Sequence, residues 1–98
     1  MIKYSIHYGD DIIVKVSGHA LYSDKGTDIV CASVSSMLTM TVNLIDNLGY
    51  KFKSVTLESG NTSFDVINNE VTKGIVTTLE ELLDSLVKKY PENIKRIS

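Results

Sequence analysis

The sequence predicts an α+β domain in which an antiparallel or mixed sheet is packed with two helices, in the order ββαββαβ. Three observations predict it. Residues 2–8 and 12–16 alternate between apolar and polar side chains, as half-buried strands do. Residues 29–48 and 71–90 carry apolar side chains at three- and four-residue spacing, which is typical of amphipathic helices. Further strand-like segments follow each predicted helix, and the 98 residues make a single domain, 1–98.

The first two strands are expected to form an antiparallel hairpin. Apolar residues of the first strand alternate with Lys3, Ser5 and His7, so His7 is expected on the polar face. Gly9-Asp10-Asp11 is a turn signal, and the alternation resumes after it. The apolar positions of the two strands are Ile2, Tyr4, Ile6, Tyr8, Ile12, Val14 and Val16.

The first helix is expected to begin at Asp28, which is well suited to the N-cap position, and to end before Gly49. Its predicted apolar stripe is Val30, Val34, Met37, Leu38, Thr41, Leu44, Ile45 and Leu48.

A second hairpin, 51–58 and 62–67, is predicted around Ser59-Gly60-Asn61, and Asn68 or Asn69 is expected to cap the second helix. The predicted stripe of that helix is Val71, Ile75, Leu79, Leu82, Leu83, Leu86 and Tyr90. Pro91 ends the helix, and residues 94–97 are long enough for a short closing strand.

Composition narrows the classes of function. A net charge of -2 argues against direct nucleic-acid binding through phosphates. No run approaches the roughly 18 apolar residues of a membrane span, and the N-terminus lacks a signal-peptide pattern, so we expect a cytoplasmic protein. One cysteine cannot form an internal disulfide, and with His7 and His19 it makes a poor zinc set. We therefore expect no metal, and the absence of nucleotide-binding glycine motifs gives no support for a cofactor.

The lone cysteine occupies a chemically suggestive position. With Asp28 as the N-cap, Cys31 is the third helical residue, where free N–H groups and the helix dipole favour a thiolate. His19 lies twelve residues upstream, in a polar segment that Gly18 and Gly26 bracket. If this loop folds back, the imidazole becomes a base for the thiol. The alternative is that Cys31 is a small buried apolar residue.

Several neighbouring residues have candidate roles in the same site. Asp28 either caps the helix or acts as a third catalytic member that holds His19, with Asp24 a weaker candidate for the second role. Ser35 lies one helical turn beyond Cys31 and either faces the site or packs the helix through its small side chain. Backbone N–H groups at the helix start, including that of Cys31, are candidates to stabilise an oxyanion.

The loop 17–27 contains few apolar anchors, so we expect it to be mobile and to close over a bound peptide. Its glycines and its residues Ser23, Asp24 and Lys25 are the basis of this expectation. Leu21 and Tyr22 are the side chains expected to pack over an apolar group of the substrate.

Gly18-His19-Ala20, followed by Gly26-Thr27-Asp28-Ile29-Val30-Cys31-Ala32-Ser33-Val34-Ser35, resembles the signature of the ribosomal-processing cysteine protease family, Prp. The resemblance implies a catalytic dyad of His19 and Cys31. It also implies a homodimeric cytoplasmic endopeptidase that removes a short N-terminal extension from a large-subunit ribosomal protein, cutting after a hydrophobic, aromatic-containing motif. The alternative is a non-enzymatic dimeric binding module of the translation machinery in which Cys31 is merely packed.

Overall fold

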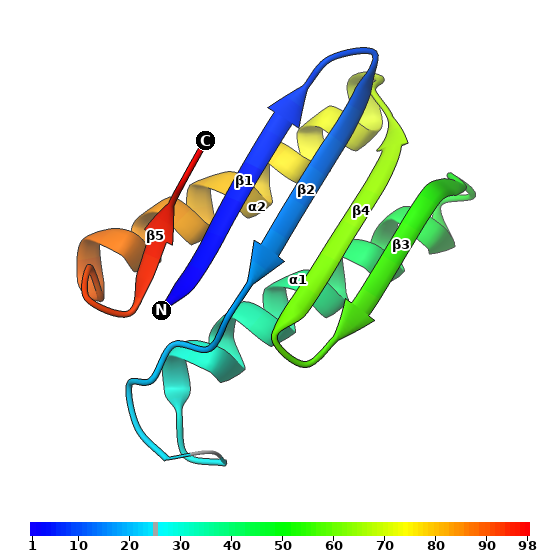
Figure 1. Ribbon diagram of the computed structural model, residues 1–98. Helices are drawn as coiled ribbons and strands as arrows, with labels where there is room; N and C mark the ends of the chain where they lie inside the picture. The colour runs from blue at the N-terminus through cyan, green and yellow to red at the C-terminus, as the bar shows by residue number, and fades with distance from the viewer. Residues whose placement is uncertain (25) are drawn as a thin grey trace.

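The computed structural model describes residues 1–24 and 26–98, and it has the predicted element order (Figure 1). Lys25, which the sequence places in the loop expected to be mobile, lies outside the described residues. The strands are β1 (Ile2–Tyr8), β2 (Asp11–Ser17), β3 (Phe52–Glu58), β4 (Asn61–Ile67) and β5 (Ile94–Arg96). The helices are α1 (Ile29–Asn47) and α2 (Glu70–Lys89).

The five strands form one mixed sheet in the order β3-β4-β2-β1-β5. The neighbours β3–β4, β4–β2 and β2–β1 are antiparallel, whereas β5 pairs with β1 in parallel. Both helices cover the same face of the sheet (Figure 1). The predicted two-layer α+β fold is therefore confirmed, including the hairpin of β1 and β2.

The alternation of the strands determines which face meets the helices. In the central ladders, Val14 lies opposite both Ile6 of β1 and Phe64 of β4, and all three side chains are buried. His7 points away from this core and is exposed, as predicted. The strand residues of the core are Ile2, Tyr4, Ile6, Ile12, Val14, Val16, Phe64, Val66 and Ile94.

Helix α2 buries a stripe that matches the predicted one at Leu79, Leu83 and Leu86 but differs from it elsewhere. Its buried residues are Thr72, Val76, Leu79, Leu83 and Leu86. Val71 and Leu82, which the sequence pattern assigned to the core, are 43% and 46% exposed. They lie instead, with Ile75, along an apolar groove between the two helices. Asn69 is the N-cap, and Thr72 completes the capping box, so a threonine takes a core position that hydrophobicity alone does not reveal.

Helix α1 is long and apolar. It is 19 residues long with a mean hydropathy of 1.5, so by length and composition it meets the usual test for a membrane-spanning helix. This corrects the expectation that no segment approaches that test. One face of α1 packs into the core through Val34, Leu38 and Ile45. Core helices of globular domains pass the same test, so length and composition are weak evidence for a membrane span.

Candidate active site

The predicted site residues gather where α1 begins, between the loop that follows β2 and the turn that joins β3 to β4. His19 and Cys31 both line a small cavity of about 70 Å³, which Gly18 and Gly60 also line. They also line a larger open cleft of about 470 Å³, together with Leu21, Asp28 and Ser35. The tertiary structure thus brings the thiol and the imidazole to the same cleft.

The carboxylate of Asp28 has hydrogen bonds on both of its oxygens. Oδ1 accepts from the backbone N–H groups of Val30 and Cys31, each at 3.0 Å, so Asp28 is the N-cap of α1. Oδ2 accepts from the N–H groups of Tyr22 at 2.9 Å and Ser23 at 3.3 Å. One side chain therefore caps the helix and ties the loop to it. In the described residues both oxygens are used by backbone N–H donors, which is the cap role rather than the role of holding His19.

These bonds also change the acidity of Asp28. Desolvation alone raises the pKa of the carboxyl, but the N–H donors of Cys31, Ser23, Tyr22 and Val30 outweigh it and hold the pKa below the usual 3.8. The carboxylate is consequently ionised throughout the neutral range, and its negative charge lies against the positive end of the helix dipole.

Cys31 is partly exposed, and its sulfur is already hydrogen-bonded. Sγ accepts from the backbone N–H of Ala20 at 3.2 Å, which is a contact that the sequence did not suggest. The backbone N–H of Cys31 itself donates to Asp28, and the next N–H, of Ala32, donates to the Asp28 carbonyl at 3.0 Å. The expectation that the Cys31 N–H is available to an oxyanion is therefore wrong for this conformation, because the cap already uses it.

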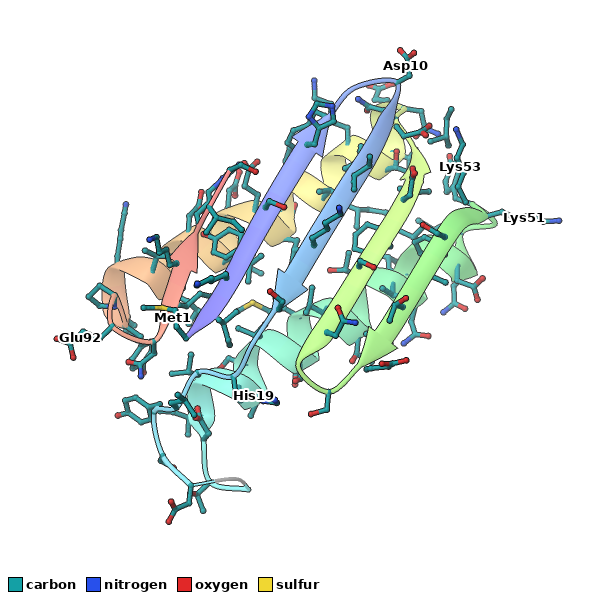
Figure 2. The ribbon with its side chains drawn as sticks, in the orientation of Figure 1. Met1, Asp10, His19, Lys51, Lys53 and Glu92 are labelled. Carbon is teal, nitrogen blue, oxygen red and sulfur yellow. The ribbon has the colours of Figure 1, made fainter. Side chains whose placement is uncertain are left out.

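His19 is exposed, and its ring lies against the β3–β4 turn rather than on the sulfur. Figure 2 shows the labelled side chain beside the start of α1 and directed toward that turn. Within residues 1–24 and 26–98, no hydrogen bond joins the imidazole to Cys31 Sγ. The backbone before it is tied to the turn, since the Gly18 N–H donates to the Gly60 carbonyl at 3.0 Å.

The backbone of Met1 and a positive φ both require glycine at position 18. Its φ of +93° is unfavourable for other residues, and a Cβ there would lie 2.3 Å from the carbonyl oxygen of Met1. The carbonyl of His19 accepts a hydrogen bond from the Met1 amine, so the residue that precedes β1 also holds the segment that carries His19.

The loop has more anchors than its composition predicts. The Asn93 amide donates to the Ala20 carbonyl at 3.0 Å, and the Ser23 and Thr27 hydroxyls lie 2.7 Å apart. Tyr22 packs edge-on against Tyr90, with ring centroids 5.3 Å apart. These contacts are polar or depend on residues distant in the chain, which is why a count of apolar loop residues misses them.

Leu21 and Tyr22, which are expected to contact an apolar group of the substrate, have different surroundings in the structure. Leu21 lines the cleft, is 78% exposed, and has a φ of +55° that is uncommon for a leucine. Tyr22 instead lies on Tyr90. Ser35 lines the cleft one turn beyond Cys31, as its spacing predicts.

Sequence reasoning missed Ser59, Gly60 and Asn93 as neighbours of the site. The first two were recognised only as a turn, and no local pattern links any of the three to Cys31. Across the described residues there is no cluster of three or more His, Cys, Asp or Glu side chains able to hold a metal ion.

An accessible thiol at a helix N-terminus, sharing an open cleft with an imidazole, is the arrangement of a cysteine hydrolase. Comparison with known protein families leads to the same class of enzyme. The sequence profile described as Cysteine protease Prp matches residues 1–95, so the chain belongs to this family and is a cysteine protease.

Relatives and solved structures support the same assignment. The Ribosomal processing cysteine protease Prp of Staphylococcus aureus is 30% identical over 86 residues, covering 84% of this chain and 81% of that protein. A crystal structure of S. aureus Prp with a covalently linked product peptide has a TM-score of 0.88 at 29% identity, covering 98% of this chain and 97% of the other. A second S. aureus structure, with a substrate peptide, has a TM-score of 0.82 at 27% identity, covering 99% and 98%.

The double role of Asp28 predicts different effects for two substitutions. Asp28→Asn keeps one acceptor oxygen for the helix, whereas Asp28→Ala keeps none. In amide hydrogen exchange we expect Tyr22 and Ser23 to become faster in both variants, and Val30 and Cys31 to become faster mainly in Asp28→Ala. Asp28→Ala is also expected to be the less stable variant in urea unfolding. Equal exchange at Val30 and Cys31 in the two variants would contradict the cap.

The same carboxylate gives a pH dependence of known sign. Because the native pKa lies below the unfolded value near 3.8, the ionised carboxylate stabilises the fold above that pH. The stabilisation is lost as the pH falls through the lowered native pKa. The difference in unfolding free energy between the wild type and Asp28→Asn should therefore be constant near neutrality and shrink below about pH 4.

Proposed function

We propose that this cysteine protease removes the N-terminal extension of a large-subunit ribosomal protein during ribosome maturation, using His19 and Cys31 as its catalytic dyad. The observation that carries the proposal is that the two side chains line the same open cleft at the start of α1. The S. aureus relatives, which are ribosomal processing proteases with peptide complexes, support a ribosomal protein as substrate.

The mechanism follows from the two side chains. The His19 imidazole takes the proton of the Cys31 thiol, and the thiolate attacks the carbonyl carbon of the scissile peptide bond. The imidazolium then protonates the leaving amine, and the C–N bond breaks to leave a thioester on Cys31. Water, deprotonated by His19, attacks the thioester, releases the new carboxylate and restores the thiol.

The surroundings of the sulfur hold it at the cleft before substrate arrives. The Ala20 N–H donates a hydrogen bond to Sγ at 3.2 Å. Asp28 supports the site by holding the loop, and Ser35 and Leu21 line the cleft where the peptide would lie.

A first test uses the ribosomal protein itself. Incubation with the large-subunit protein encoded in the same genome should shorten its N-terminus, which intact mass measurement detects. Cys31→Ala and Cys31→Ser are expected to lower the rate by more than about 10³-fold, and His19→Ala by about 10²- to 10⁴-fold, with the fold unchanged by circular dichroism. His7→Ala, on the polar face of β1, is the matched control and should cleave normally. Sustained turnover by Cys31→Ala would overturn the mechanism.

The binding-module alternative has a separate test. Membership in a family of cysteine proteases favours the enzyme. A module with a packed cysteine would react with iodoacetamide only on unfolding, whereas the proposed enzyme should be alkylated at Cys31 while folded, at a rate that depends on pH and on His19.

We also propose that the loop 17–27 closes over the peptide. The loop carries both His19 and the cleft residue Leu21, and ordering it would hold the imidazole against the β3–β4 turn, at the edge of the cleft that Cys31 lines. Closure around a bound chain would assemble the dyad only on a substrate that orders the loop. Hydrogen exchange should show faster loop amides in the free protein and slower ones with a non-cleavable substrate peptide. Equal protection in both states would mean a preformed site.

We propose that the protein is a cytoplasmic homodimer. Apolar side chains exposed on the helix layer support self-association, since Met40 is 66% exposed beside Val71 and Leu82. Sedimentation at micromolar concentration should give a species of twice 10.8 kDa. A single 10.8 kDa species would contradict the dimer.

A further inference from the structure

The β3–β4 turn contacts the imidazole of His19 through a residue that has no side chain. Gly60, in this turn, has a φ of +74°, and a Cβ built on it would lie 2.6 Å from His19 Nε2 and 2.8 Å from Cε1. Real Cβ atoms do not approach other atoms that closely. With a Cβ at position 60 the ring would have to move, so its observed position depends on glycine there.

The same residue also holds the backbone that carries the ring. The Gly60 carbonyl accepts from the Gly18 N–H at 3.0 Å, one residue before His19. This bond continues the β2–β4 ladder, in which Ser17 lies opposite Asn61. Gly60 thus contacts the segment twice, at the backbone by hydrogen bonding and at the ring by close approach. The residues of both contacts line the small cavity that Cys31 also lines.

We infer that Gly60 is a positioning residue for the proposed catalytic histidine: the β3–β4 turn seats the His19 imidazole at the edge of the cleft that holds Cys31. The inference rests on the proposed role of His19 as the base. It adds a second segment, distant in sequence from the His19 and Cys31 motifs, to the machinery of the site. The turn acts through His19 and needs no contact with the peptide.

The distances between the added Cβ and the ring set the expected effect of Gly60→Ala on the reaction rate. Ordinary van der Waals contact begins near 3.4 Å, so an alanine at position 60 requires the Nε2 end of the ring to move by most of an ångström. The ring is exposed, so the ring gives way rather than the fold. A displacement of about 1 Å in a catalytic group is enough to cost about 10²-fold in rate.

Gly49 offers a matched control. Its φ of +89° imposes the same kind of left-handed strain on an alanine, but a Cβ there meets nothing within 4 Å. Gly49→Ala therefore reports the strain alone, and Gly60→Ala reports the strain together with the displaced ring. The two variants should lose similar stability in urea unfolding.

The test compares Gly60→Ala, Gly49→Ala, His19→Ala and the double variant Gly60→Ala/His19→Ala. With the ribosomal protein as substrate, Gly60→Ala should lower kcat by about 10- to 100-fold with KM little changed, and Gly49→Ala should keep the wild-type kcat. The pH profile of Cys31 alkylation by iodoacetamide should change in Gly60→Ala. On the His19→Ala background, adding Gly60→Ala should change the alkylation rate by less than about twofold.

A kcat for Gly60→Ala equal to that of Gly49→Ala would overturn the inference, and so would an effect of Gly60→Ala on alkylation that persists without His19. The ring resonances of His19 in NMR spectra give a readout that needs no turnover, and they should shift in Gly60→Ala but not in Gly49→Ala. Unshifted resonances would also overturn it. Failure of the proposed function is distinct, because the wild type would then not shorten the ribosomal protein, or His19→Ala would cleave it as fast as the wild type.

Discussion

The site depends above all on the carboxylate of Asp28. The first N–H groups of a helix have no partner within the helix, and Asp28 satisfies two of them with one oxygen. Its other oxygen holds the N–H groups of Tyr22 and Ser23. In the same loop, the N–H of Ala20 donates to the sulfur of Cys31. Charge-assisted bonds of this kind are stronger than neutral ones, so one ionised group organises the helix start and the loop together.

The sheet supplies the other side of the cleft. Strands β2 and β4 are antiparallel, so the end of β2 lies beside the start of β4 and hence beside the β3–β4 turn. The chain leaves β2 at Ser17 and enters the site at once, with Gly18 bonded to Gly60. The cleft is therefore built from three segments, the loop, the start of α1 and the turn, and only the first two are adjacent in sequence.

The hydrogen bonds at the start of α1 limit which groups can stabilise an oxyanion during catalysis. The N–H groups of Val30, Cys31 and Ala32 are all engaged by Asp28, two at its side chain and one at its carbonyl. Spacing alone made the Cys31 N–H a candidate oxyanion donor, but a cap and an oxyanion compete for the same hydrogen. The cap stabilises the helix in the resting protein, so oxyanion stabilisation requires other donors or a rearrangement of the cap.

Sequence by itself determined the elements, the two-layer α+β fold, and the placement of Cys31 in the first turn of α1 with Asp28 as its cap, while the parallel pairing of β5 that makes the sheet mixed came only from the structure. The features that sequence determined depend on local periodicity and short spacing, so each can be seen within a few residues. Helix α2 shows the limit of the method. Val71 and Leu82 are apolar yet exposed, while Thr72 is buried, because the rotation of a helix on a sheet depends on what it packs against. Only the tertiary structure decided that Ala20 bonds the sulfur, that Asn93 holds the loop, and that Gly60 makes room for His19. Those contacts join residues that strand pairing and helix packing bring together, and no local pattern records such pairs.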